Sequence, residues 1–114
     1  MGCKPNSMLL PISDSRPLVW WRPRLVTVTL STGQSGAYAS RQMSAGTGDR
    51  LMYNIFTDPS CTTIFGDGNG GSRQLINSLG KGIPWVIPYY GRIPAGQDVA
   101  AGLYGDRLVL TVDF

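Results

Sequence analysis

The final segment of the chain, residues 107–114, places an apolar side chain at every second position. A β-strand directs alternate side chains to opposite faces, so a strand here would have one wholly apolar face and one mostly polar face. This pattern predicts a strand that is buried on one side against a core. The apolar face would consist of Leu108, Leu110, Val112 and Phe114.

Similar short strand patterns recur along the rest of the chain, with turn-forming residues between them. Residues 25–31 and 50–57 alternate, and residues 61–65 would return as a short partner strand. Residues 84–93 are extended but contain prolines, which indicates an edge strand, whereas 73–79 fit either a strand or a helical turn. Fifteen glycines and eight prolines in 114 residues favour tight turns. The predicted fold class is all-β, an antiparallel β-sandwich.

Residues 1–24 differ from the remainder of the chain. Their apolar stretch is too short, and too often cut by proline, to be recognised as a signal peptide. No apolar run of eighteen residues is present to form a transmembrane helix. We therefore expect an irregular leader over residues 1–24 and one folded domain over residues 25–114. The prolines that interrupt the leader are Pro5, Pro11, Pro17 and Pro23.

The absence of two residue types excludes several classes of catalytic and metal-binding site. It contains no His and no Glu, which removes a Ser-His-Asp triad, a Cys-His pair and His-containing zinc sites. The seven acidic residues are all Asp, and most adjoin Gly or Pro, where Asp commonly bonds its own turn. The ten Lys and Arg residues are scattered, unlike those of a nucleic-acid-binding face. We expect no enzyme, no small-molecule substrate and no nucleic-acid partner.

The glycine-rich loop at residues 66–71 matches two ligand-binding patterns in part. A dinucleotide site would need a helix after the loop, but Pro84 and Pro88 interrupt the segment that follows. A calcium loop would need Gly at Ser72 and Glu at Ser78. We therefore interpret the stretch as an ordinary turn and expect neither a cofactor nor a metal.

The two cysteines of the chain are Cys3 and Cys61. A bridge between them would imply an oxidising compartment. Because the sequence supplies no geometry for a disulfide, the bridged and the free forms both remain open at this point.

Four ordered motifs resemble those of the spore coat protein U domain. They are LMYNIFTD at residues 51–58, TTIFGDG at 62–68, YGRIPAGQ at 90–97 and AGLYGD at 101–106, followed by the terminal strand. The resemblance covers about residues 25–114, and the family includes pilin subunits of archaic chaperone–usher pili. It implies a secreted, incomplete immunoglobulin-like sandwich that lacks one strand.

The resemblance also implies a function and partners. A periplasmic chaperone, and then the neighbouring pilus subunit, would donate the missing strand during assembly through an usher. The chain would then be a structural subunit of a surface pilus or coat, located in the periplasm and outside the cell. Leu108, Leu110, Val112 and Phe114 would form one wall of the groove that receives the donor, although they also fit the core face of an ordinary final strand.

The chain departs from the family pattern near its start. Family members begin with a signal peptide, a first strand and a Cys pair, none of which is recognisable here. Phe65 stands where Trp is usual, and Cys61 lies in a turn that usually has no Cys. The family's disulfide therefore cannot be assigned to this chain. We hypothesise that residues 1–24 are a non-native leader fused to a truncated domain.

Two other functions fit parts of the sequence. The terminal Phe after alternating apolar residues also resembles the last strand of an outer-membrane β-barrel, but a barrel would need many more such segments. Alternatively, the chain is a secreted glycan-binding module, as in an adhesin tip. Its stacking platform would consist of Trp85, Tyr89 and Tyr90.

Overall fold

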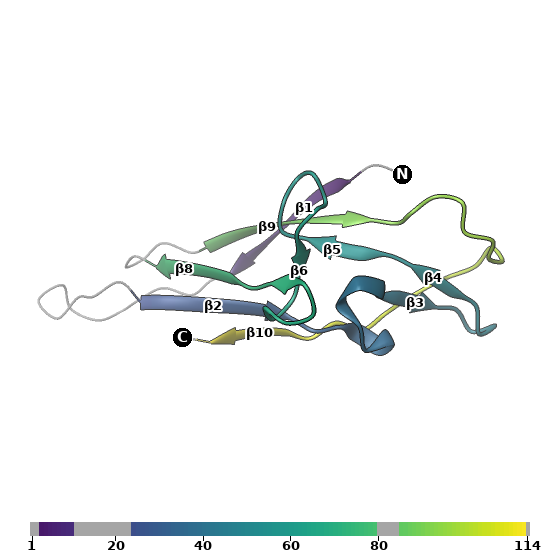
Figure 1. Ribbon diagram of the computed structural model, residues 1–114, viewed down its shortest axis with the longest axis horizontal. Helices are drawn as coiled ribbons and strands as arrows, with labels where there is room; N and C mark the ends of the chain where they lie inside the picture. The colour runs from purple at the N-terminus through teal and green to yellow at the C-terminus, as the bar shows by residue number, and fades with distance from the viewer. Residues whose placement is uncertain (1–2, 11–23, 80–84, 114) are drawn as a thin grey trace, which may run out of the picture.

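The computed structural model describes residues 3–10, 24–79 and 85–113. In these ranges the chain forms two facing β-sheets of unequal width and a small additional hairpin (Figure 1). The fold is all-β, as predicted. Within the described ranges, no helix is long and apolar enough to cross a membrane.

The narrower sheet has three strands in the order β10-β2-β8. The central strand β2 (Arg24–Leu30) pairs in antiparallel fashion with β8 (Leu75–Leu79) on one side and β10 (Leu110–Asp113) on the other. The alternation in β2 turns Val26 and Val28 toward the core, where both are completely buried. The strand predicted over 25–31 is therefore confirmed.

The wider sheet has five strands in the order β1-β9-β5-β6-β7. Its long strands β1 and β9 pair over seven residues, and β5 pairs with the other side of β9. The strands β6 and β7 contain only two residues each and extend the sheet at one edge. The strand bounds are β1 (Lys4–Leu10), β5 (Asn54–Phe56), β6 (Ile64–Phe65), β7 (Ser72–Arg73) and β9 (Trp85–Arg92).

Two predictions about individual strands are wrong. The single strand expected over 50–57 is two strands, because β4 (Arg50–Met52) pairs with β3 (Gln42–Ser44) whereas β5 belongs to the wider sheet. The proline-containing strand β9 is not an edge strand. It lies between β1 and β5, and Pro88 is tolerated there opposite Ser7 of β1.

The beginning of the chain also differs from the prediction. Residues 1–24 were expected to be irregular, but Lys4–Leu10 form β1, so the expectation is wrong for these seven residues. The S–S bond between Cys3 and Cys61 fastens the start of β1 to the turn before β6. The question that the sequence left open is thereby answered: the two cysteines are bridged.

The core lies between the two sheets. Its buried side chains come from both sheets, since Val26, Val28 and Leu30 meet Phe65 and Ile87. Further apolar side chains are only partly buried around this centre. They are Met8, Ile55, Leu75, Tyr89, Leu108, Leu110 and Val112.

One side of the sandwich is closed by a very short connection. The edge strand β7 is followed, after the single residue Gln74, by the edge strand β8 of the other sheet. These two edges therefore lie on the same side, and the remaining edges, β1 and β10, lie on the opposite side. In Figure 1, β10 follows the lower margin, whereas β1 starts at the upper margin and crosses behind β9 toward the middle of the molecule.

Loss of the Cys3–Cys61 disulfide should lower stability strongly. The bridge spans a sequence separation of 58 residues, and closing a loop of this size contributes on the order of 4 kcal/mol in the chain-entropy model. We expect Cys3→Ser to lower the free energy of unfolding by several times more than Ser60→Ala, measured by urea titration without reductant. Equal urea midpoints for the two variants would contradict this role of the disulfide.

Candidate functional site

Strand β10 has a free edge. In the described part of the chain, it pairs with β2 on one side and with no strand on the other. The N–H of Ser31 donates to the carbonyl of Val109 (3.0 Å), so the odd-numbered residues of this segment bond toward β2. Antiparallel pairing alternates the direction of the backbone groups, and those of Leu110 and Val112 therefore point to the free edge. Unpaired groups in such a row can pair with an added strand.

The apolar face of the terminal segment points into the sandwich. Leu110 lies opposite Leu30, and Val112 lies opposite Val28, in the register of β10 with β2. Both pack against the buried core together with Leu108, yet all three remain only partly buried. Phe114, the fourth residue of the predicted wall, lies outside the described residues. Among the described residues, the terminal segment thus has the inward face that the sequence predicted.

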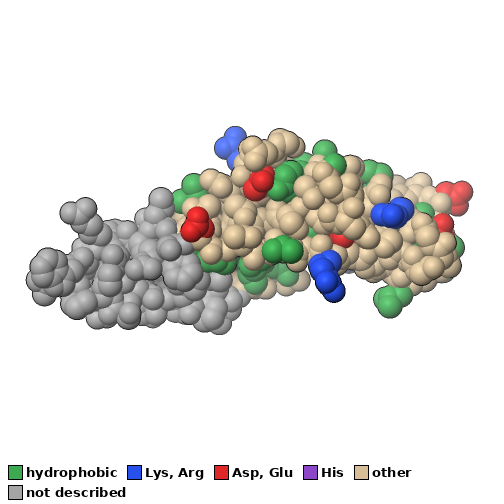
Figure 2. All heavy atoms as spheres, turned by 90° about the horizontal axis from the view of Figure 1, so that it is seen from below, with side chains coloured by type: hydrophobic (Ala, Val, Ile, Leu, Met, Phe, Trp, Pro, Cys, Tyr) green, Lys and Arg blue, Asp and Glu red, His purple; other side chains and the backbone are tan. Residues whose placement is uncertain are grey.

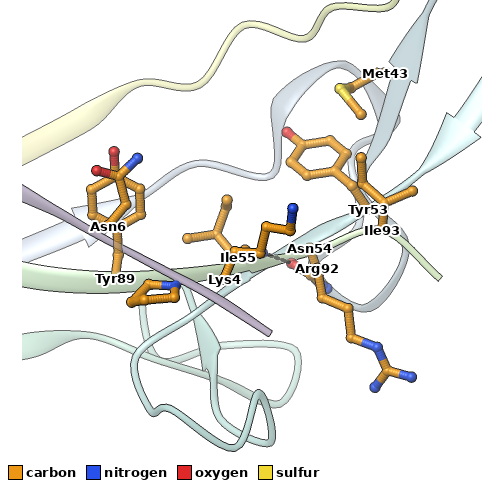
Figure 3. Close-up of a pocket in the computed structure, with 11 residues that line it drawn as sticks. Lys4, Asn6, Met43, Tyr53, Asn54, Ile55, Tyr89, Arg92 and Ile93 are labelled. Carbon is orange, nitrogen blue, oxygen red and sulfur yellow. Dashed lines mark hydrogen bonds between the residues drawn. The ribbon is translucent and has the colours of Figure 1, made fainter. Parts of the chain in front are cut away.

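A cavity of about 450 Å³ opens on the inner face of the wider sheet. In Figure 3, Asn6, Ile55 and Tyr89 rise on one side of β1, β5 and β9, toward the C-terminal segment drawn in pale yellow. Tyr89 and Ile55 also belong to the partly buried ring around the core, as do the inward residues of β10. The cavity lining comprises Lys4, Pro5, Asn6, Met43, Tyr53, Asn54, Ile55, Tyr89, Gly91, Arg92 and Ile93.

We use the word groove for this cavity together with the inward side chains of the terminal segment, which are Leu108 and, in β10, Leu110 and Val112. The groove exists because the three-stranded sheet is too narrow to cover the whole inner face of the five-stranded sheet. Figure 2 shows the molecule from the β10 side, with hydrophobic side chains in small scattered groups over the described surface and with isolated rather than clustered Lys and Arg. The arrangement fits an extended, largely apolar segment better than it fits a compact polar ligand.

Asp106 fixes the segment that leads into β10. Its carboxylate accepts hydrogen bonds from the Tyr53 hydroxyl (2.5 Å), the Gln34 N–H (3.0 Å) and the Arg107 N–H (2.8 Å). Burial, followed by the hydrogen bond to Asp106, raises the pKa of Tyr53, so the phenol stays protonated and remains a donor. The carboxylate therefore ties the start of the terminal strand to the wall of the groove.

Backbone pairing supports the same segment. Ser44 and Gly105 exchange two hydrogen bonds, with N···O distances of 2.8 and 3.0 Å. The Gln34 side chain donates to the carbonyls of Gly105 and Gln42 (3.1 and 3.0 Å). The approach to β10 is thus held by β3 and by Gln34 as well as by Tyr53 of the groove wall.

A buried guanidinium joins the two sheets behind the groove. Arg41 is completely buried and donates to the carbonyls of Ser31 and Phe65 and to Oδ1 of Asn54, at 2.6 to 3.1 Å. It also lies 5.3 Å from the ring centroid of Tyr38. Burial lowers its pKa from the ordinary value, but an arginine pKa is so high that the group stays charged at neutral pH.

Sequence reasoning missed the roles of Arg41 and Asp106. Asp106 was interpreted as a turn residue that bonds its own backbone, which is only one of its three hydrogen bonds. Asp58 and Asp67 do behave in the predicted way, because they accept N–H groups of their own turns, from Thr62 and Asn69. The position of Asp106 at the end of the AGLYGD motif was the available signal in the sequence. A motif does not, however, identify a hydrogen-bond partner about fifty residues away.

The proposed aromatic platform is not assembled on one face. Tyr89 and Tyr90 are consecutive residues of β9 and therefore point to opposite faces of the sheet. Tyr89 lines the groove, whereas Tyr90 shares the outer face with Phe56. The side chain of Trp85 lies outside the described residues. In the described ranges, no group of three His, Cys, Asp or Glu side chains could hold a metal ion.

Comparison with known proteins gives matches of three kinds. The Spore Coat Protein U domain matches residues 23–111. Protein U of Myxococcus xanthus is 32% identical over 85 residues, which is 74% of this chain and 46% of that protein. The chain thus spans about half the length of this curated relative.

The third match is to a solved structure. A chain in the CsuC–CsuE chaperone–tip adhesion subunit pre-assembly complex, from the archaic chaperone–usher Csu pili of Acinetobacter baumannii, is 21% identical. It matches with a TM-score of 0.57 over 96% of this chain and 40% of that chain. At this identity, the likeness shows a common fold.

Two glycines test the Asp106 anchor as a matched pair. Gly33 and Gly36 both have positive φ (+73° and +77°), so an alanine at either position carries similar backbone strain, about 1–2 kcal/mol. A Cβ at Gly33 would overlap the Asp106 carboxylate, whereas a Cβ at Gly36 would meet no atom within 4 Å. We expect Gly33→Ala to lower the free energy of unfolding more than Gly36→Ala, measured by urea titration. Equal losses would show that the anchor contributes little.

Proposed function

The chain belongs to the Spore Coat Protein U domain family, and we propose that it is a structural subunit of a surface pilus or coat. In this proposal, its assembly proceeds by donor-strand complementation through a chaperone–usher pathway. The observation that carries the proposal is the free edge of β10 beside an open, largely apolar groove.

An added strand would pair with the free edge of β10 and fill the groove at the same time. Its backbone would pair with the groups of Leu110 and Val112 that point to the free edge, and its alternate side chains would enter the groove. Each apolar side chain buried in this way contributes about 1.5–3 kcal/mol, so three of them make a long-lived joint. The same edge, left open in a free chain, is a site of unwanted association, which explains the need for a chaperone.

The partners in this proposal follow the order of assembly. A periplasmic chaperone would first fill the groove, and a segment of the neighbouring subunit would replace it at the usher. The Cys3–Cys61 disulfide fits this path, because the periplasm and the cell exterior are oxidising. The solved relative comes from a chaperone–subunit complex, which supports a chaperone as the first partner.

We further propose that residues 25–114 form the pilin-like domain, with a role that is structural rather than catalytic. The family match over 23–111 supports this boundary. Strand β1, which precedes the boundary, adds the outermost strand to the wider sheet and forms one margin of the groove. In this proposal, β1 covers part of the interior, and none of the strands in the described ranges covers the free edge of β10.

Neighbouring residues of β10 provide a matched test. Val112 points into the groove, whereas Thr111 is exposed on the outer face. We expect Val112→Asp to abolish co-purification with a co-expressed periplasmic chaperone of an archaic chaperone–usher system, because a carboxylate would be buried in an apolar joint. Thr111→Asp should leave it nearly unchanged. Co-purification yields that are equal for the two variants would count against donor-strand assembly.

A further inference from the structure

The inner face of β1 is polar at one end. In the register of β1 with β9, Met8 lies opposite Ile87, which is completely buried. Residues two and four positions earlier share this face of the sheet, so Asn6 and Lys4 also lie on its inner side, where both are exposed to solvent. Both line the groove, and Figure 3 shows the Lys4 ammonium on the same side of the sheet as Ile55.

The groove around Lys4 offers no acidic side chain among the residues that the structure describes. The rest of the groove is mainly apolar or aromatic, and none of its described lining residues is a carboxylate. Arg92, the other cation of the lining, points away from the cavity in Figure 3. Asn6 uses Oδ1 to accept the N–H of Ser7 (2.8 Å), which leaves its amide nitrogen as a donor toward the groove. This end of the groove thus presents two donors and no charged acceptor.

Contacts of neighbouring residues show where this polar end of the groove lies relative to β10. Tyr53 lines the cavity together with Lys4, and its hydroxyl bonds Asp106, four residues before β10 begins. Lys4 therefore lies near the start of β10. Met8, at the other end, packs against the core with Val112. A strand along the free edge of β10 would meet apolar side chains at one end and the ammonium group at the other.

A strand that covers Lys4 changes the hydration of its charge. An apolar or cationic side chain above the ammonium would remove water without replacing its hydrogen bonds, which is costly. A carboxylate would instead accept a charge-assisted hydrogen bond from Lys4 and could also accept one from the Asn6 amide. The groove therefore discriminates by penalising the wrong occupant as well as by attracting the right one.

We propose that the segment which fills this groove carries an acidic side chain at the inward position facing Lys4, with apolar side chains at the other inward positions. The proposal rests on the proposed function, since it specifies the donor strand. In it, Lys4 sets the register of the donor, because a shift by one residue would turn the carboxylate outward.

Synthetic ten-residue peptides with alternating apolar residues test the proposal. Each series contains three peptides, which differ only at one inward position that is Asp, Leu or Lys. Because the bound strand can run in either direction, one series has this position near the N-terminus of the peptide and the other has it near the C-terminus. Each peptide is titrated into the full, disulfide-bonded chain, and the dissociation constant is measured by fluorescence anisotropy. In one series, we expect the Asp peptide to bind about tenfold more tightly than the Lys peptide, a preference that falls with added salt.

Charge reversal and a matched control complete the experiment. Lys4→Glu should reverse the preference between the Asp and Lys peptides, and Lys4→Gln should abolish it. Arg50→Glu, at an exposed cation on β4 away from the groove, should keep it. Equal binding of all three peptides, or an unchanged preference in Lys4→Glu, would overturn this inference alone. If no peptide bound, including the Leu peptide, the strand-accepting groove itself would be refuted.

Discussion

The unequal width of the two sheets is the constraint from which the rest of the structure follows. Five strands face three, and a one-residue connection closes the sandwich on the β7–β8 side. The missing cover must therefore lie on the opposite side, between β1 and β10. The open interior and the free backbone edge result from this one imbalance, and the donor strand that we propose would cover both.

The incomplete sandwich needs other interactions to hold its shape. Arg41 links the two sheets, because its buried guanidinium donates to the carbonyls of Ser31, directly after β2, and of Phe65 in β6. Asp106 holds the approach to β10 so that the strand presents a fixed edge. The disulfide at Cys61 fastens β1, the other margin of the groove. These contacts surround the groove and leave its mouth open.

The local sequence pattern predicted most of the strands. The features that it did not predict depend on pairing between segments that are far apart in the sequence. Alternation located β2 and β10 and the inward face of Leu110 and Val112, because a period of two needs no knowledge of neighbours. The same rule could not show that β9 is central, since this depends on β1, in a segment where prolines mask the strand pattern. The inward face of the terminal strand was thus predicted, while Lys4 was missed because its orientation follows from pairing with β9.

Amide hydrogen exchange along β10 tests the central claim most directly. In the chain alone, the amides of Leu110 and Val112 should exchange rapidly, whereas those of Thr111 and Asp113, which bond toward β2, should be protected. Adding the chaperone or a donor peptide should protect Leu110 and Val112 as well. If these two amides were already as protected as that of Thr111 in the chain alone, the edge would be occupied and the account would be wrong.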